Sequence, residues 1–337
     1  MDFDLSDDQL ALRDGARDLL DDLASADRVR AHTTTADAFD RTLWDAMAEQ
    51  GWLGIEVPEA RGGVGLGFVE AAILGEEIGR HAAPAPFAPT LLALDALTHA
   101  GDDEWTDRLL AGDAIACVAW DVNAPVPYAP SADVAIVCTD DAVYACALGE
   151  RPRREPAMDL TRELGWLAFD PATARRVGDA DARARLLDRG AALACADLLG
   201  SGGRALDLAV EYARDRVQFG RPIGSFQAVK HRCADMLVDV EGMRSTTYWA
   251  AWCLGAGDPD ASIAASTAKI WCADASKRVM ASALQVHGGI GFTWEHDLHF
   301  FMKRAQLDQL TFGDASYHRA RLTALLRPRV EAGESVV

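Results

Sequence analysis

The chain has 337 residues, half of them apolar, which is enough to bury one large domain or two to three small ones. Its formal net charge of −19 argues against nucleic acid or an anionic lipid surface as a general partner. The acidic start Met1–Asp4 does not resemble a signal peptide, and no run of about 18 apolar residues could span a membrane. We therefore expect a cytoplasmic protein without membrane association.

The cysteines are scattered, odd in number and never spaced as CxxC. The seven are Cys117, Cys138, Cys146, Cys195, Cys233, Cys253 and Cys272. They lie in apolar stretches, so we expect reduced thiols in the core.

The N-terminal third is predicted to be helical. Ser6 and Gln9 form a capping box, and leucines follow at helical spacing. Further helices are expected over Asp40–Gln50, over Phe68–Gly79 and, after the break at Pro84–Pro89, up to about Gly112. The glycine-rich stretch Gly62–Gly67 could imitate a phosphate loop, but no Gly-Lys-Ser/Thr follows it.

A small β region is predicted from about Ala114 to Pro171. Its expected strands are Ala114–Trp120, Asp133–Thr139, Ala142–Leu148 and Gly165–Phe169. Asp140-Asp141 is typical of a tight hairpin turn.

From Asp181 onward the chain is predicted to be helical again. The expected helices are Ala182–Val217, Phe226–Leu254, Asp260–His287, a short one near His296–Ala305, and Ala315–Leu326. Long helices with short connections favour an antiparallel bundle. We therefore predict a mainly α protein with a helical domain at 1–112, a reduced β domain at 113–178, a four-helix bundle at 179–330 and a tail at 331–337.

Three C-terminal segments carry candidate chemistry. Arg214–Ile223 places arginines at a helix junction, where they either bind a phosphate or diphosphate or pair with Glu211 and Asp215. Gln285–Phe292 has three glycines, which permit a close backbone approach to a ligand. In Leu310–Arg319, the simplest role of Asp314 is to cap a helix.

Together with the N-terminal segment Phe3–Arg80, these segments resemble the acyl-CoA dehydrogenase family. The pattern Arg-x-x-Phe-Gly-x-x-Ile…Gln is carried by Arg216, Phe219, Gly220, Ile223 and Gln227, and Gln-x-x-Gly-Gly-x-Gly by Gln285, Gly288, Gly289 and Gly291. Their presence in the family's order makes a chance resemblance improbable.

The resemblance implies an FAD enzyme that desaturates an acyl-CoA thioester and passes electrons to an electron-transfer flavoprotein or a similar acceptor. In such enzymes a carboxylate removes the proton next to the thioester, and the flavin takes a hydride from the next carbon. The resemblance also implies that Arg216, Phe219, Gln227, Gln285, Gly288 and Gly289 contact FAD held mainly by the neighbouring subunit.

The expected base is missing. In an ungapped comparison from Ala305 to Arg319, Phe312 stands where the family has its Glu. Some members carry the Glu on the first C-terminal helix, and Gly190 stands near that place. Asp188 is a weak substitute, because a shift of two residues turns a helical side chain by roughly 200°. Asp314 is also a weak substitute, because its simplest role is to cap a helix.

The β region is also shorter than the family's and lacks its Gly-Ser-Asp segment and its aromatic-Ile-Thr loop. We therefore predict a subunit that pairs with a homologous full-length acyl-CoA dehydrogenase, as in heterotetrameric enzymes of steroid side-chain degradation. The alternatives are an active homomeric enzyme with another base, a flavin-free binding subunit, and a metal protein.

The metal alternative depends on His296 and His299, which lie at i, i+3, with His287 nearby. No third His or Cys ligand stands at a metal-site spacing, so we expect no metal.

Overall fold

A computed structural model describes residues 4–35 and 39–335 of the chain. The beginning of the predicted segment Phe3–Arg80 and the end of the predicted tail lie outside these residues. The chain divides into two compact units. Of the described residues, the bundle unit comprises 4–13, Gly75–Ala82 and 191–335, and the middle unit comprises 14–35, 39–74 and Ala83–Gly190.

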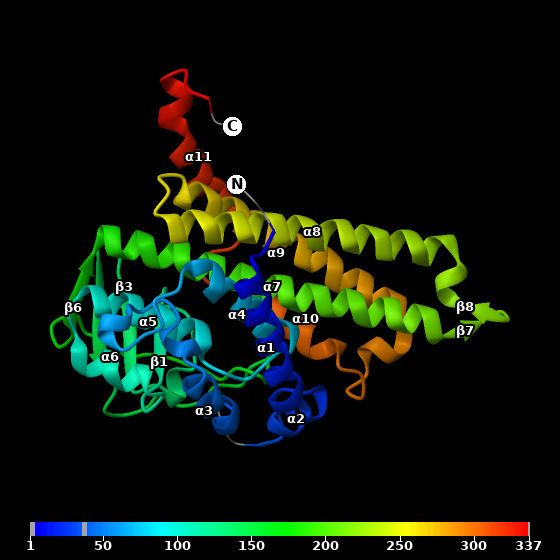
Figure 1. Ribbon diagram of the computed structural model, residues 1–337, viewed down its shortest axis with the longest axis horizontal. Coiled ribbons are helices and arrows are strands. Elements are labelled where there is room, and N and C mark those ends of the chain that lie inside the picture. Colours follow the sequence, from blue (N-terminus) through cyan, green and yellow to red (C-terminus); the bar gives the residue numbers. More distant parts are fainter. Residues whose placement is uncertain (1–3, 36–38, 336–337) are drawn as a thin grey trace. The chain divides into compact units, whose positions relative to one another are not determined.

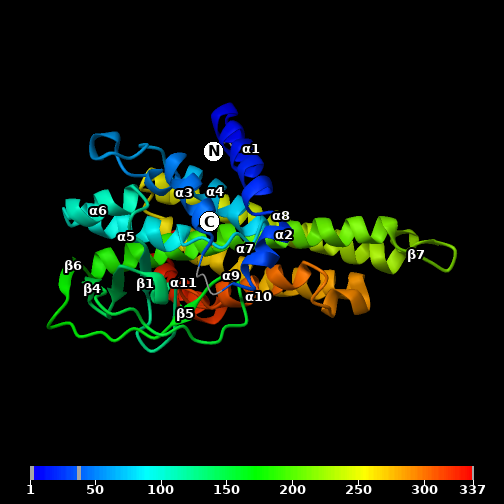
Figure 2. The same ribbon diagram turned by 90° about the horizontal axis from the view of Figure 1, so that it is seen from below.

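Long helices form the bundle unit (Figures 1 and 2). They are α7 (Ala180–Asp215, from Ala191 onward), α8 (Gln227–Ala256), α9 (Ala261–His287), α10 (Leu298–Asp308) and α11 (Ala315–Glu331). The strands β7 (Val217–Gln218) and β8 (Arg221–Pro222) form a hairpin between α7 and α8, which projects from one end of the unit in Figure 1. The predicted bundle is confirmed.

Most helices of the chain's first third belong to the middle unit. They are α2 (Ala26–His32), α3 (Arg41–Glu49), α5 (Phe87–His99) and α6 (Asp103–Leu110), while α1 (Asp7–Leu23) and α4 (Phe68–Arg80) continue from one unit into the other. Helix α5 includes Pro89, which the prediction had placed in a break. Proline is tolerated there because the first amides of a helix have no acceptor within it.

A four-stranded sheet lies in the middle unit, with strand order β1-β3-β4-β6. The strands are β1 (Ala116–Ala119), β3 (Val134–Cys138), β4 (Ala142–Ala147) and β6 (Arg175–Asp179), and β2 (Val126–Pro127) pairs separately with β5 (Leu164–Gly165). The predicted turn at Asp140-Asp141 joins β3 to β4. The predicted strand Gly165–Phe169 is wrong beyond Gly165, and β6 was not predicted because its two arginines hide the usual apolar alternation.

Glycines let α4 and α7 approach closely within the bundle unit. A Cβ at Gly200 would lie 1.8 Å from the Glu76 carbonyl oxygen, and a Cβ at Gly79 would lie 2.2 Å from the Asp197 carbonyl oxygen. Two polar side chains of α8 hold the same segment, since Arg244 and Tyr248 each donate to the Glu76 carboxylate at 2.7 Å. Gly200 therefore continues α7 and serves the packing of α4 on it.

The glycine-rich loop is not a phosphate cradle. Its backbone amides already have acceptors within the chain. The amide of Val64 donates to the Gly54 carbonyl, that of Gly65 to the Val57 carbonyl, and that of Leu66 to the Ile55 carbonyl. A Cβ at Gly63 would lie 2.0 Å from the Val57 carbonyl oxygen, so the glycine serves close backbone packing. Among the described residues, no helix has the length and apolar character needed to cross a membrane.

Candidate functional site

The β7–β8 hairpin presents a phenylalanine at its tip. Gln218 pairs with Arg221, and the two residues between them have φ values of 54° (Phe219) and 76° (Gly220). Two positive values define a type I′ turn, which suits the twist of a hairpin. Phe219 is 91% exposed, and its only described ring partner is Phe226, with 6.0 Å between the ring centroids. A left-handed, exposed phenylalanine is costly in an isolated chain, which marks the hairpin as a functional element.

Arg216 immediately precedes this hairpin and is exposed. Its backbone is well held, because its amide donates to Tyr212 and its carbonyl accepts from Ile223. Its guanidinium has no hydrogen bond or ion pair within residues 4–35 and 39–335. Glu211, one of the acids proposed to neutralise this region, pairs with Arg204 at 3.5 Å instead. Arg216 is therefore available to an anion.

An aromatic contact brings the glycine segment beside the end of α7. The rings of Tyr212 and His287 stack with 4.9 Å between centroids. Tyr212 lies one turn before Arg216, and His287 is the last residue of α9. The imidazole Nδ1–H of His287 donates to the Ala283 carbonyl at 2.8 Å, and burial lowers the pKa of this histidine. Two segments some 70 residues apart in sequence thus meet at one end of the bundle unit.

Gly288 and Gly289 leave open space next to this contact. Gly288 has φ 62°, and a Cβ on either residue would meet no atom within 4 Å. Gly291 differs, because its Cβ would lie 3.0 Å from the His287 Cβ. Gln285 is exposed on the last turn of α9, and Gln227 is exposed at the uncapped first turn of α8. Open glycines, carboxamides and a helix N-terminus fit a diphosphate-containing ligand.

The turn between α10 and α11 holds Phe312 where the base was expected. Phe312 is buried and has φ 57°. Its carbonyl accepts from the His318 Nε2–H at 2.9 Å, and the buried Lys269 ammonium donates to the Asp308 and Gln309 carbonyls at 2.7 and 3.1 Å. The turn is rigidly held but carries no proton acceptor at position 312. Lys269 and His318 were missed by the sequence reasoning. A lysine inside an apolar helical stretch was the available signal for Lys269, whereas His318 lies among polar residues and gave none.

The two substitute acids lie in different surroundings. Asp314 is the N-cap of α11, and its carboxylate accepts from the Tyr317 amide at 2.8 Å, as predicted. Asp188 is buried in the part of α7 that belongs to the middle unit, as is Gly190.

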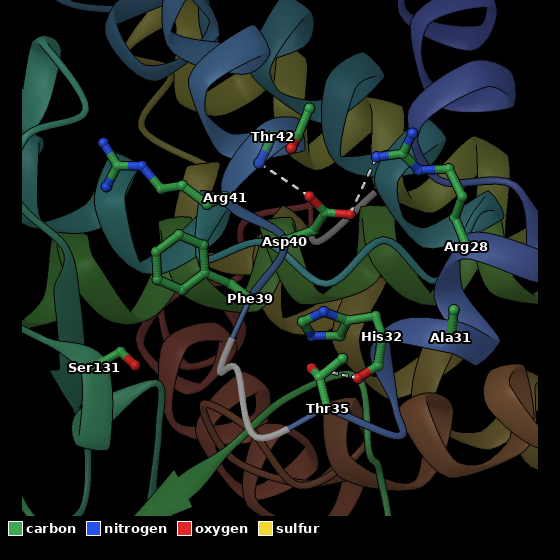
Figure 3. A pocket seen from close by; sticks show the side chains of 9 residues that line it. All are labelled: Arg28, Ala31, His32, Thr35, Phe39, Asp40, Arg41, Thr42 and Ser131. Atoms are coloured by element: carbon green, nitrogen blue, oxygen red, sulfur yellow. Dashed lines mark hydrogen bonds and ion pairs between the residues drawn. The ribbon is translucent and has the colours of Figure 1, made fainter.

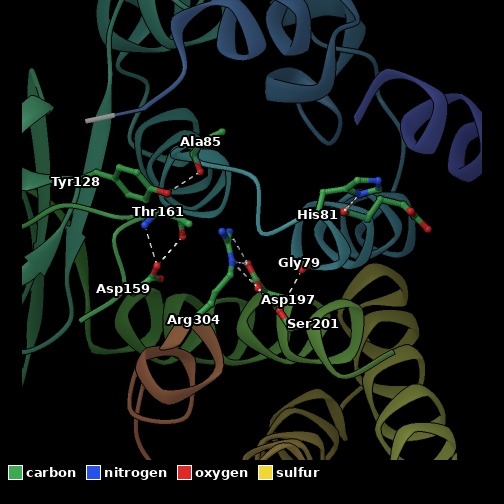
Figure 4. A network of polar contacts seen from close by, with 10 residues as sticks. Gly79, His81, Ala85, Tyr128, Asp159, Thr161, Asp197, Ser201 and Arg304 are labelled. Atoms are coloured by element: carbon green, nitrogen blue, oxygen red, sulfur yellow. Dashed lines mark hydrogen bonds and ion pairs between the residues drawn. The ribbon is translucent and has the colours of Figure 1, made fainter. Parts of the chain in front are cut away.

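Buried hydrogen bonds and an ion pair stabilise each unit from within (Figure 4). In the bundle unit, the guanidinium of Arg304 on α10 forms two nearly parallel bonds to Asp197 on α7, at 2.9 and 3.0 Å. In the middle unit, the Tyr128 hydroxyl donates to the Ala85 carbonyl at 3.0 Å, and the Tyr128 backbone amide donates to the Glu163 backbone carbonyl. Tyr128 thereby anchors the segment after β1, where the family's Gly-Ser-Asp segment was sought, in the core of its own unit.

Two cavities of the middle unit do not add a second site. One of about 620 Å³ is lined by Arg28, His32, Asp40 and Arg41 (Figure 3). Its cations are already paired, Arg28 with Asp40 and Arg41 with Asp45. Glu56 lines a cavity of about 330 Å³, and burial raises the pKa of its carboxyl. Glu56 accepts from Arg189 at 2.5 Å, so it serves an ion pair.

The histidines named for a metal site have other contacts. His287 and His296 lie edge to face at 4.3 Å between centroids, and His296 accepts the Leu298 amide on Nδ1. Within the described part of the chain, no three His, Cys, Asp or Glu side chains are grouped to hold a metal ion.

Comparison with known proteins shows the family. Residues 6–114 match the N-terminal domain of acyl-CoA dehydrogenases, and residues 177–326 match their C-terminal domain. The chain is 33% identical over 326 residues to the acyl-CoA dehydrogenase IpdE2 of Mycolicibacterium smegmatis, covering 95% of this chain and 99% of the relative. The chain belongs to the acyl-CoA dehydrogenase family. The family and the fold predicted from the sequence are thereby confirmed.

Other acyl-CoA dehydrogenases are similar over most of their length. FadE27 of Mycobacterium tuberculosis is 31% identical, with 90% of this chain and 93% of the relative covered. In the crystal structure of the ChsE4-ChsE5 complex from the same organism, a chain matches with a TM-score of 0.87 and 30% identity, covering 97% of this chain and 99% of that one. The steroid acyl-CoA dehydrogenase Tcur3481-Tcur3483 matches with a TM-score of 0.86 and 28% identity, covering 96% and 99%.

FAD is the cofactor that this family membership implies. The available Arg216 guanidinium, the open Gly288-Gly289 backbone and the exposed Gln285 fit its anionic diphosphate and polar ribose. The family's catalytic carboxylate has no counterpart at position 312, because Phe312 carries a hydrocarbon ring there.

Proposed function

We propose that this chain is the subunit of a heteromeric acyl-CoA dehydrogenase that completes the FAD site of a homologous, full-length subunit without supplying the base. The observation that carries the proposal is the exposed Arg216, without an ion pair among the described residues, beside the open glycine turn. On an acidic protein such a cation is most useful against an anion brought by a partner.

Several residues would hold the flavin nucleotide. Arg216 would form paired hydrogen bonds to the diphosphate, and Phe219 would pack against the nucleotide from the hairpin tip. The side-chain amides of Gln227 and Gln285 would exchange hydrogen bonds with the nucleotide. The backbone at Gly288 and Gly289 would approach the nucleotide closely. FAD, when bound, supplies hydride acceptance in the desaturation of an acyl-CoA thioester.

Proton removal would belong to the partner. Phe312 cannot accept a proton, and Asp314 already accepts from the Tyr317 amide. Two similar structures support an assembly of unlike chains, since their names give two proteins each, ChsE4-ChsE5 and Tcur3481-Tcur3483. The second is named a steroid acyl-CoA dehydrogenase, so a steroid or another large acyl group is the substrate that we propose, with an electron-transfer flavoprotein or a similar carrier as acceptor.

The decisive experiment compares the chain alone with the chain co-expressed beside a full-length homologue from the same organism. For the chain alone we expect no bound flavin and no acyl-CoA oxidation. For the complex we expect bound flavin and acyl-CoA oxidation. Full flavin occupancy with turnover by the single chain would favour the homomeric alternative. A stable complex without a flavin absorbance band would favour a flavin-free binding subunit.

Arg216→Gln tests the site within that complex. We expect FAD to dissociate more readily, by about tenfold or more, because one charge-assisted contact to the diphosphate is lost. Arg327→Gln is the matched control, because Arg327 is also exposed but lies on α11. Equal FAD retention in both variants would contradict the role given to Arg216.

A further inference from the structure

Basic side chains gather around the β7–β8 hairpin although the chain as a whole is acidic. Residues 214–232 carry five basic side chains and one acidic side chain, whereas the whole chain has a formal net charge of −19. The five, which we call the basic patch, are Arg214, Arg216, Arg221, Lys230 and Arg232. All of them are exposed. The hairpin that they surround projects from one end of the bundle unit (Figure 1).

The chain itself does not neutralise the basic patch. The Arg221 guanidinium lies 4.1 Å from the centroid of the Phe226 ring, and Arg232 donates to the Ser282 hydroxyl at 3.5 Å. Neither contact brings a negative charge. Among the described residues, no carboxylate forms an ion pair with any of the five cations. The isolated chain therefore holds several like charges close together, and they repel one another.

The start of α8 adds to this positive charge. Its N-cap residue, Phe226, offers no side-chain acceptor to the first amides, and the first turn contains no acidic residue. Lys230 follows directly after that turn. The first amides of a helix carry a partial positive charge, which favours acidic side chains and disfavours basic ones. Lys230 is therefore unfavourable in the isolated chain and becomes favourable beside negative charge from another molecule.

Exposed apolar side chains share the hairpin with the basic patch. Val217 is 54% exposed, and Phe219, which is also exposed, lies beside the ring of Phe226. Apolar groups bordered by exposed charges are typical of a protein interface, where the charged rim steers association. The diphosphate of FAD, which the proposed function gives to Arg216, leaves the other cations of the patch without a counter-charge.

We propose that the basic patch docks on carboxylates of the partner subunit that border its FAD site. This inference rests on the proposed function, because it takes the same partner. Arg214, Arg221, Lys230 and Arg232 meet acidic side chains of that subunit, while Arg216 remains for the diphosphate. The net negative charge of the chain repels an acidic protein at long range. The patch supplies local attraction and fixes which end of the bundle unit meets the partner.

Lys230→Glu tests this docking in the complex of the full chain with its full-length homologue. At about 50 mM salt we expect the dissociation constant of the complex to rise by about tenfold, because a like charge replaces a complementary one. At about 500 mM salt the rise should be much smaller, because exposed charges are then screened within a few ångströms. Dilution of the complex at both salt concentrations measures this. Weakening of equal size at both would overturn the proposal.

Two matched variants control for net charge and for side-chain length. Arg327→Glu changes the net charge by the same amount, but Arg327 lies exposed on α11, so the complex should keep its affinity. Lys230→Arg keeps the positive charge and should bind as the unmodified chain does. Equal dissociation constants for Lys230→Glu and Arg327→Glu would overturn the proposal while leaving the proposed function intact.

Unfolding of the isolated chain separates docking from a structural role. Lys230→Glu should unfold at the same denaturant concentration as the unmodified chain or at a slightly higher one, because glutamate suits the start of a helix. A variant that folds as well and binds less tightly acts through the interface. Unfolding at a markedly lower denaturant concentration would assign Lys230 to the fold and overturn its role in docking.

FAD retention separates carboxylates of the partner from the flavin diphosphate. In the formed complex, Arg216→Gln should release FAD more readily, whereas Lys230→Glu should release it at the unmodified rate. Equal release from the two variants would assign Lys230 to the nucleotide and overturn the inference alone. If the unmodified chain forms no complex with the homologue, the proposed function fails and the inference with it.

Discussion

The side chain of Phe312 is buried, and its backbone has φ 57° in a turn held by Lys269 and His318. A non-glycine residue in this region of φ and ψ costs on the order of 1–3 kcal/mol, so the surrounding contacts must impose it. The turn thus keeps a constrained backbone at a position that has no acid-base chemistry. The nearest carboxylate in sequence, on Asp314, is engaged by a helix amide.

Substitution of Asp314 separates capping from catalysis. Asp314→Ala should lower the free energy of unfolding by about 1 kcal/mol, because the Tyr317 amide loses its acceptor. Asp314→Asn should retain both stability and the acyl-CoA oxidation of the complex, since asparagine caps equally well but cannot take a proton. Denaturant unfolding and turnover assays check both outcomes, and a collapse of turnover in Asp314→Asn would identify this residue as a base.

His287 should make the stability of the chain depend on pH. Burial lowers its pKa in the folded chain below the ordinary 6.5. The unfolded chain therefore binds a proton first as pH falls, so the free energy of unfolding should decrease from about pH 7 down to the lowered folded pKa. Denaturant unfolding at several pH values should show a smaller decrease for His287→Asn. An equal decrease in both proteins would assign the pH effect to other groups.

At the scale of elements, the crossing of α4 and α7 depends on which glycine faces the partner helix. Gly200 faces the backbone of α4, since a Cβ added there would lie 1.8 Å from the Glu76 carbonyl oxygen, whereas a Cβ at Gly203 would meet only a guanidinium nitrogen of Arg80, at 3.8 Å. Both glycines lie inside the same helix, so the intrinsic helical cost of glycine is the same for both.

Alanine at these two positions should act in opposite directions. Gly200→Ala should destabilise the chain by about 2 kcal/mol or more, because backbone atoms of α4 must move away. Gly203→Ala should stabilise it by about 0.5–1 kcal/mol, because alanine is the better helix former and the space is open. Thermal or denaturant unfolding of the pair checks this, and equal effects would mean that α4 and α7 are not packed through Gly200.

At the scale of the whole molecule, apolar side chains are exposed on the elements that carry the candidate site. Phe219 is 91% exposed in the hairpin, and Phe292 and Trp294 are 75% and 62% exposed after the glycine turn. Aromatic residues of this kind are typical anchors of protein interfaces. Their exposure in the single chain fits a subunit whose normal state is a complex.

Hydrogen exchange should locate the interface. When the chain joins its partner, we expect slower exchange of the amides in β7–β8 and in Gly288–Trp294. Phe292→Ser should weaken the complex, because an apolar anchor is lost, while leaving the unfolding of the isolated chain nearly unchanged. Val330→Ser is the control, since Val330 is 62% exposed on α11. Unchanged exchange in both segments on complex formation would place the interface elsewhere.

Much of the local structure followed from the amino-acid pattern. The capping box at Ser6, the hairpin turn at Asp140-Asp141 and the cap at Asp314 depend on neighbouring residues, and each is present. The ends of α5 and α11 and the strand β6 were missed or misplaced, because packing and sheet pairing decide them. The division into domains at 112, 178 and 330 stays a prediction.

The sequence by itself determined the family, the helical bundle and the absence of a carboxylate at position 312, since these depend on residue identity and short-range spacing. Only the tertiary structure decided that Arg216 has no ion pair among the described residues, that Tyr212 and His287 join two distant segments, and that the buried Lys269 ammonium holds the turn before α11. Which groups meet, and which stay available, depends on how helices far apart in the chain pack together, and no local pattern encodes that.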